Sequence, residues 1–225
     1  MASVRESLLI LQDRIAQAAT RTQRDPSEIQ LLAVTKGVQI DRIAEAYALG
    51  LRDFGENYWQ ESKAKLEQMP SDSRWHFIGR LQTNKAKYLI GRFHWVCSVE
   101  SLRQLQELQL WASKLEHIQS ILIQIKVSEE PSKGGATVEV FDRLIDSARA
   151  MPNLKIGGVM AIPAYTDDPE AVRPAFAMAR QTFERLHRTE RITLSMGMSH
   201  DLEAAITEGA TQIRIGTALF GPRDR

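Results

Sequence analysis

Short apolar runs recur along the chain, separated by longer segments in which polar and apolar residues are mixed. Each run is rich in branched or aromatic residues and is bounded by glycine or polar residues, which is typical of a strand buried on both faces of a sheet. Strands that alternate with helices form parallel sheets, and eight of them suit closure into a (β/α)₈ barrel. The eight runs span residues 31–35, 51–54, 75–79, 94–98, 121–127, 156–162, 193–196 and 213–216.

The segments between the runs predict the helices that such a barrel needs. Their apolar residues recur at helical spacing and so form one apolar face. The opening segment has the same spacing, which adds an N-terminal helix that packs either across the bottom of the barrel or on its side. The residues expected on these faces are Leu8, Leu11, Ile15 and Ala18 in the opening helix, Ile43, Ala46, Tyr47 and Gly50 after the first run, Leu102, Leu105, Leu108 and Leu115 after the fourth, and Phe141, Leu144, Ile145 and Ala148 after the fifth.

The length of 225 residues suits a single barrel domain over residues 1–225, because α/β barrels commonly reach this size. No linker, low-complexity tract or shift in composition divides the chain. An open doubly wound sheet is the alternative, but no Gly-x-Gly-x-x-Gly sequence follows an early strand to favour a dinucleotide-binding fold.

Charge and cysteine content exclude several classes of protein. The net charge is +1, so nothing indicates nucleic acid or an anionic membrane as a partner. The lone Cys97 excludes an internal disulfide and fits a reducing compartment. The N-terminus lacks a secretory signal and no run is long enough to span a bilayer, so we expect a cytoplasmic protein. The five histidines are scattered without paired ligand spacing, which predicts no metal site.

Lys36 ends the first apolar run and is followed at once by Gly37. A lysine at the carboxyl end of a buried strand is held at the mouth of a cavity and partly desolvated. Desolvation favours the neutral amine, which is the form that makes a Schiff base with an aldehyde. The alternative is a lysine whose stem covers the strand while its ammonium group reaches water.

The loops after the seventh and eighth strands predict an anion site, because barrel enzymes commonly hold phosphate there. Ser199 follows the seventh strand, and Gly216 and Thr217 follow the eighth, where a short helix begins. Hydroxyl groups and backbone amides bind phosphate oxygens, and glycine lets the backbone approach closely. Each residue also has a simpler interpretation, in which Ser199 or Asp201 caps a helix and Gly216 permits a turn.

Two further polar residues are candidates for the same end of the barrel. Arg214 alternates with two isoleucines, so it faces the barrel interior if they face the helices. A buried salt bridge, a ligand nitrogen or a phosphate would satisfy its charge. Asn57 follows the second strand and either donates to a ring oxygen of a ligand or caps the next helix.

A Schiff-base lysine beside a phosphate site has two common chemical meanings. One is pyridoxal 5'-phosphate (PLP) bound permanently as a cofactor. The other is a class I aldolase, whose lysine captures a phosphorylated sugar. Residue spacing does not separate the two.

The sequence resembles the pyridoxal phosphate homeostasis protein family in several blocks that run in order over nearly the whole chain. The longest block, at residues 75–85, is distinctive enough to make chance similarity improbable. The blocks are LLAVTK at 31–36, FGENY at 54–58, WHFIGRLQTNK at 75–85, GVMAI at 158–162, LSMGMS at 194–199 and RIGTALFG at 214–221.

The resemblance implies a barrel of the alanine racemase N-terminal type with PLP joined to Lys36 as a Schiff base. It also implies that Arg214 faces the pyridine nitrogen and that Asn57 and Met160 lie beside the cofactor. The phosphate-binding residues that it implies are Ser199, Gly216 and Thr217.

The chain departs from the family pattern in three places. Val159 stands where the family often has Leu, and His200 stands where it often has Asp, which could change the pH response at the phosphate edge. Residues 131–135 are a variant of a loop that carries Lys and Gly. None of these positions touches Lys36.

These features predict a non-catalytic carrier or buffer of PLP in vitamin B6 and amino-acid homeostasis. An arginine is always charged and cannot accept the proton that makes the pyridine ring a strong electron sink. The residues after Gly216 are also too few for the second domain that racemases with this barrel add. The alternatives are a low-activity amino-acid racemase, a class I aldolase and a protein-interaction module. We expect a monomer that passes PLP to apo-enzymes, with a regulatory protein as a further possible partner.

Overall fold

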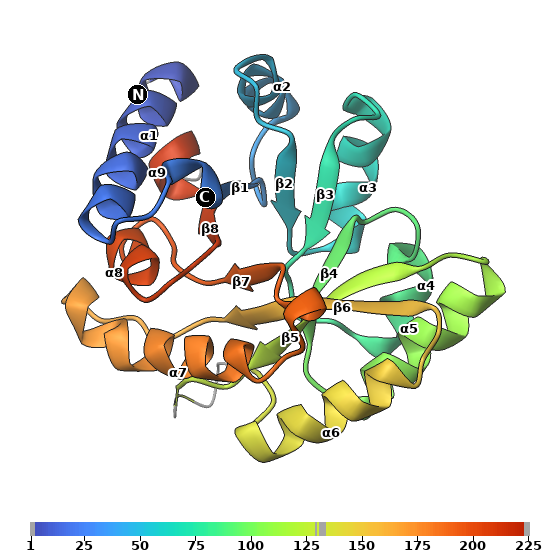
Figure 1. The fold of residues 1–225 in the computed structure, drawn as a ribbon. Helices are drawn as coiled ribbons and strands as arrows, with labels where there is room; N and C mark the ends of the chain where they lie inside the picture. Colours follow the sequence, from blue (N-terminus) through green and yellow to red (C-terminus); the bar gives the residue numbers. More distant parts are fainter. Residues whose placement is uncertain (1–2, 129, 131–133, 223–225) are drawn as a thin grey trace.

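Eight parallel strands close into a barrel in the order in which they occur along the chain (Figure 1). The structure, a computed structural model, describes residues 3–128, 130 and 134–222. The strands are β1 (Gln30–Val34), β2 (Asp53–Glu56), β3 (Arg74–Phe77), β4 (Trp95–Val99), β5 (Gln119–Ile125), β6 (Leu154–Ala161), β7 (Thr193–Ser195) and β8 (Gln212–Ile215). The predicted barrel is confirmed, with strand ends shifted by one or two residues at most positions.

Helices cover the outside of the barrel, and one or more follow each strand. The α-helices are α1 (Val4–Arg21), α2 (Ile40–Ala48), α3 (Trp59–Gln68), α4 (Ala86–Leu89), α5 (Leu102–Lys114), α6 (Val138–Arg149), α7 (Arg173–Glu184), α8 (Leu202–Thr207) and α9 (Thr217–Phe220). Short 3₁₀ helices span Pro26–Glu28, Thr83–Lys85, Pro169–Val172 and Arg188–Glu190. Within the described residues, no helix is both long and apolar enough to cross a membrane.

Successive side chains along each strand point to opposite faces of the sheet, which gives the protein two separate apolar regions. One set of side chains packs between the strands and the helices, and this is the larger core. The other set faces the barrel axis and forms a smaller cluster of Leu32, Ile78, Cys97, Leu122 and Met160. The barrel interior is therefore filled with side chains, as expected for this fold.

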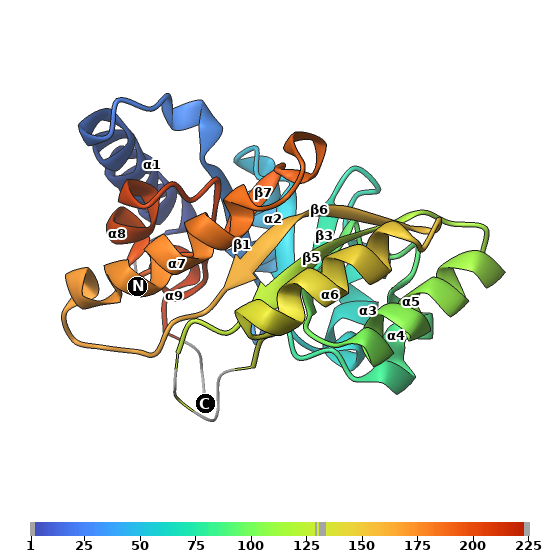
Figure 2. The same ribbon diagram turned by 60° about the horizontal axis from the view of Figure 1, so that its bottom comes forward.

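The N-terminal helix α1 packs on the side of the barrel, where it lies against α8, α9 and α2 (Figures 1 and 2). Its predicted face is correct, since Leu8, Leu11, Ile15 and Ala18 are all buried. Of the two predicted positions, the bottom of the barrel is wrong. The last two helices, α8 and α9, are short, and α1 packs against both of them.

Two predicted helix faces extend too far. Leu105 and Leu108 of α5 are buried, but Leu102 and Leu115 are exposed, because they lie at the two ends of the helix, outside its contact with the strands. Gly50 lies beyond the end of α2 and has a φ of +99°, so it permits the turn that leaves the helix.

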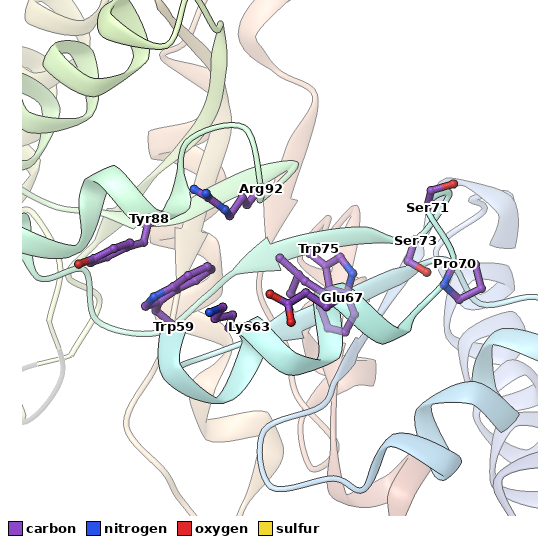
Figure 3. Close-up of a pocket in the computed structure, with 10 residues that line it drawn as sticks. Trp59, Lys63, Glu67, Pro70, Ser71, Ser73, Trp75, Tyr88 and Arg92 are labelled. Carbon is purple, nitrogen blue, oxygen red and sulfur yellow. The ribbon is translucent and has the colours of Figure 1, made fainter.

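A shallow groove lies between α3 and the segment that follows β3. The groove exists because α4 has only one turn and does not cover the outer side of β3. It encloses about 530 Å³. Figure 3 shows Trp59, Lys63 and Glu67 along one wall, with Tyr88 and Arg92 facing them. The Trp59 and Tyr88 rings stack with their centroids 5.5 Å apart.

Candidate functional site

Lys36 lies just past β1, at the rim formed by the carboxyl ends of the strands. The Thr35 amide donates to the Gly55 carbonyl at 2.9 Å, which continues the ladder one residue beyond Val34. Leu32 and Val34 belong to the apolar cluster inside the barrel. Lys36 is half-buried and lies in the turn that follows, which the Val38 amide closes by donating to the Thr35 carbonyl oxygen at 3.0 Å.

The loop after β7 brings Ser199 beside the start of α9. The Asp201 carboxylate accepts a hydrogen bond from the Met198 amide at 2.6 Å and so closes the loop on itself. The Ala218 amide donates to Ser199 Oγ at 3.2 Å, which joins this loop to the loop after β8. Burial raises the pKa of Asp201. Asp201 stands at the N-cap position of α8 but makes no side-chain cap, so the capping interpretation is wrong for Asp201. Ser199 Oγ accepts from an amide in the first turn of α9, as the capping interpretation predicts for Ser199.

Gly216 lies between the loops predicted to bind an anion and the end of β1, the strand that precedes Lys36. Ile215 pairs with Ala33 in the β1–β8 ladder, so both chains leave the barrel at the same rim. A Cβ atom added to Gly216 would lie 3.5 Å from Val34, which is ordinary contact. Thr217 follows and is exposed. Ser199, Gly216 and Thr217 are thus brought together next to the end of β1.

Arg214 is buried inside the barrel, as its alternation with two isoleucines predicts. Its guanidinium donates to Ser195 Oγ and to the Ala161 carbonyl, each at 2.9 Å. Burial lowers its pKa to about 10, and the charge of Asp201 opposes that shift. Arg214 therefore stays a cation at neutral pH. Within the described part of the chain these two hydrogen bonds use two of the five guanidinium N–H groups, and both partners are neutral, so further N–H groups remain for a ligand.

A line of polar side chains that the sequence pattern did not predict supports Arg214 from within the barrel. Ser195 Oγ donates to the Gln212 side-chain oxygen at 2.8 Å. The Gln212 side-chain amide then donates to Gln30 at 2.7 Å. Gln212 and Arg214 alternate along β8, and that pattern of polar residues in an apolar strand was the available signal.

Met160 and Asn57 lie at different depths in the barrel. Met160 is fully buried in the inner cluster and pairs with Ser195 in the β6–β7 ladder. Asn57 Oδ1 is buried and has no hydrogen-bond partner among the described residues. Such an acceptor costs about 1–3 kcal/mol unless a ligand or water donates to it. The alternative role is wrong, because α3 begins without a side-chain cap.

A buried ionic cluster on the outer side of β1 was also missed. Lys65 of α3 bonds to Glu56, Glu61 and the Thr35 carbonyl oxygen at 2.6–2.7 Å. Burial raises the pKa of Glu56, although hydrogen bonds from Lys65 and Thr35 oppose that shift. Lysine and glutamate on a helix are usually solvated, so their sequence pattern carries no signal for this contact.

The remaining predicted features lie at the edge of this arrangement. His200 is exposed, and its Nε2 atom lies 3.1 Å from the Thr166 carbonyl oxygen. Of the variant loop at residues 131–135, residues 131–133 fall outside the described part of the chain. No group of three or more potential metal ligands occurs among the described residues.

Several known proteins resemble this chain. The alanine racemase N-terminal domain family matches residues 8–224. The pyridoxal phosphate homeostasis protein of Pseudomonas aeruginosa is 43% identical, and the match covers 100% of this chain and 97% of that protein. The protein of the same name from Aquifex aeolicus is 42% identical over 97% of each chain.

Solved structures agree with the sequence matches. PipY of Synechococcus elongatus, determined with PLP bound, is 36% identical and superimposes with a TM-score of 0.79, covering 93% of this chain and 99% of PipY. An alanine racemase from Bartonella henselae is 15% identical, with a TM-score of 0.72, and covers 98% of this chain and 60% of the racemase, which shows the shared fold alone. With this fold and these full-length matches, the chain belongs to the pyridoxal phosphate homeostasis protein family, which carries the alanine racemase N-terminal domain.

Proposed function

We propose that this chain binds PLP at the carboxyl rim of the barrel, as a Schiff base with Lys36, and acts as a carrier or buffer of PLP. The observation that carries the proposal is the convergence of three features on one rim. The end of β1 bears Lys36, the joined loops after β7 and β8 offer Ser199 and Thr217, and Arg214 presents a buried cation between them. Relatives named for PLP homeostasis and the PLP-bound PipY structure support the choice of cofactor.

The residues at the rim fit the chemistry of this cofactor. Ser199 accepts from a backbone amide, which leaves its hydroxyl hydrogen for a phosphate oxygen. Gly216 leaves room for the backbone to approach the phosphate. Asn57 Oδ1 has no hydrogen-bond donor among the described residues, so a donor on the ligand would satisfy it. Met160 belongs to the apolar cluster that fills the barrel beneath the rim. PLP, when bound, supplies an aldehyde that reacts with amines and a ring that withdraws electrons.

The same residues favour storage and transfer over catalysis. Arg214 stays protonated at neutral pH, so it donates a hydrogen bond to a ring nitrogen and keeps its own proton. The ring nitrogen is then not protonated, and the ring is a weaker electron sink. Release then depends on an incoming amine that takes the place of Lys36. The candidate recipients are PLP-dependent apo-enzymes. We further propose a monomeric, cytoplasmic protein that folds as one domain over residues 1–225.

One absorbance spectrum before and after borohydride tests the proposal. The purified protein is expected to be yellow, and borohydride alone should fix a pyridoxyl group on Lys36. Lys36→Ala should abolish the fixed adduct, while the matched control Lys155→Ala, at an exposed position, should keep it. A colourless protein that is inactivated by borohydride only with a sugar phosphate would instead be an aldolase.

The racemase alternative has its own test. A racemase exchanges the α-hydrogen of an amino acid for solvent deuterium far faster than free PLP does. We expect no such enhancement, because Arg214 does not provide a proton to the ring. Rapid exchange that is lost in Lys36→Ala would overturn the non-catalytic assignment.

A further inference from the structure

Helix α3 holds the peptide groups on both sides of Lys36. On the N-terminal side, the Lys65 ammonium group donates to the Thr35 carbonyl oxygen at 2.7 Å. On the C-terminal side, the Gly37 amide donates to Glu61 Oε1 at 2.5 Å. Lys65 and Glu61 also bond to each other at 2.6 Å, so the two contacts form one unit.

The Lys65 ammonium group is fully used by this arrangement. Its three hydrogens meet three acceptors, which are the Thr35 carbonyl, Glu56 Oε1 and Glu61 Oε1. The side chain of Lys65 is 10% exposed and that of Glu56 is fully buried. Glu56 Oε1 also accepts from the Thr35 hydroxyl at 2.6 Å, which fixes Thr35 through its side chain as well as its carbonyl.

Burying such charges is not an efficient way to stabilise a fold. Desolvation of an ion pair often outweighs its attraction, and apolar side chains of similar size fill the same space at lower cost. An apolar residue at position 65 would bond to neither the Thr35 carbonyl nor Glu61. The cluster therefore supplies something that apolar packing cannot, which is a set of directed hydrogen bonds to the backbone around Lys36.

We propose that Glu61 and Lys65 are positioning residues that fix the backbone from Thr35 to Gly37, so that the Lys36 side chain leaves β1 toward the barrel interior. The inference rests on the proposed function, in which Lys36 is the residue that PLP joins. The Thr35 hydroxyl and carbonyl and the Gly37 amide all meet side chains on the α3 side, so these contacts hold the backbone immediately before and after Lys36.

The first experiment measures amide hydrogen exchange at Gly37 in the PLP-free protein. Glu61 is the acceptor for this amide in an exposed turn, so the wild-type amide should exchange slowly. Glu61→Ala should accelerate its exchange at least tenfold, whereas Glu61→Gln, which keeps an acceptor oxygen, should retain most of the protection. The matched control Glu67→Ala, an exposed residue of the same helix, should leave Gly37 unchanged.

The second experiment measures the equilibrium constant for PLP loading by borohydride fixation and peptide mapping. We expect Glu61→Ala to lower the constant about tenfold, which corresponds to ~1.4 kcal/mol, and Glu61→Gln to lower it less. Lys65→Arg should keep more of the loading than Lys65→Met. Urea unfolding of each variant separates this effect from general loss of stability.

Three results decide the outcome. An unprotected Gly37 amide in the wild-type protein overturns the inference even if no variant folds. Variants with normal loading per folded molecule and normal Gly37 exchange overturn it as well. If the wild-type protein gives no adduct on Lys36, the proposed function fails, and the Gly37 exchange rates still report whether Glu61 holds the turn.

Discussion

Arg214 carries a positive charge into the barrel with a hydroxyl and a carbonyl oxygen as its partners. Burial disfavours that charge and lowers the pKa to about 10, which still leaves the side chain protonated at neutral pH. A cation held this way attracts an electron-rich ligand atom more strongly than one already paired with a carboxylate. The residue is thus suited to binding, and it has no proton to exchange during binding.

Ser199 is expected to act on the phosphate group alone. Ser199→Ala removes the hydroxyl that faces the start of α9 and should weaken PLP binding about tenfold, a change of ~1.4 kcal/mol typical of a hydrogen bond to a charged group. Binding of pyridoxal, which lacks the phosphate, should not change. Titration with both compounds by absorbance gives the comparison, and equal weakening of the two would contradict a phosphate role.

His76 should make the fold less stable as the pH falls. Burial lowers its pKa below the usual 6.5, and its Nε2 atom bonds to Asp53 at 2.9 Å. A group with a depressed folded-state pKa stabilises the fold above its unfolded pKa, and this contribution is lost at lower pH. The free energy of unfolding in urea should therefore decrease from pH 7 to pH 5.

Asp53 also makes the fold less stable as the pH falls, but at a lower pH than His76 does. Burial alone would raise its pKa, but hydrogen bonds from His76 and Arg74 outweigh that effect and hold the pKa well below the usual range. Stability is therefore lost further as the pH falls below about 4. His76→Gln keeps a donor near Asp53 but does not titrate, so it should flatten the slope between pH 7 and pH 5. The matched control is His187→Gln at an exposed position, and an unchanged slope in His76→Gln would refute the assignment.

At the scale of elements, the carboxyl ends of β2 and β3 approach each other so closely that only glycine fits at position 79. A Cβ atom there would lie 2.0 Å from the Asn57 carbonyl oxygen. Gly79→Ala should cost about 1–3 kcal/mol of unfolding free energy, because backbone must move to remove the overlap.

The same substitution should weaken PLP binding, since it displaces Asn57 from the rim. Gly216→Ala is the comparison for stability, because its Cβ would meet Val34 at an ordinary 3.5 Å. Urea unfolding and PLP titration check both effects. Equal stability of the two variants would contradict the prediction, because it would mean that the backbone at the ends of β2 and β3 shifts to accept a Cβ atom at little cost.

For the whole molecule, the sequence pattern predicted the architecture because it depends on local periodicity. The short strands β2 and β7 each contain one large apolar residue, and β2 begins two residues after the start of the predicted run at 51–54, so the helices on either side were needed to predict them. The predicted rim residues follow from the same rule, since parallel strands end together. Leu102 and Leu115 were predicted to be buried but are exposed, because helical spacing does not indicate where the contact between a helix and the sheet ends.

Contacts between distant segments could not be predicted in this way. Lys65 reaches Thr35 across 30 residues of sequence, and that contact exists only once α3 packs on β1. The Asn57 oxygen that lacks a partner also becomes visible only when burial is known. Both are properties of the closed barrel, whereas the place of Lys36 after β1 and the burial of Arg214 follow from their positions along the strands.

A chain of hydrogen bonds runs inside the barrel from Arg214 through Ser195 and Gln212 to Gln30, and donors and acceptors follow one direction along it. Gln30 accepts from the Gln212 amide, which turns the Gln212 oxygen toward Ser195 and directs the serine hydrogen away from Arg214. Each group thus fixes the polarity of the next. A residue at the amino-terminal mouth thereby helps to keep a serine lone pair facing a guanidinium that is buried deeper in the barrel.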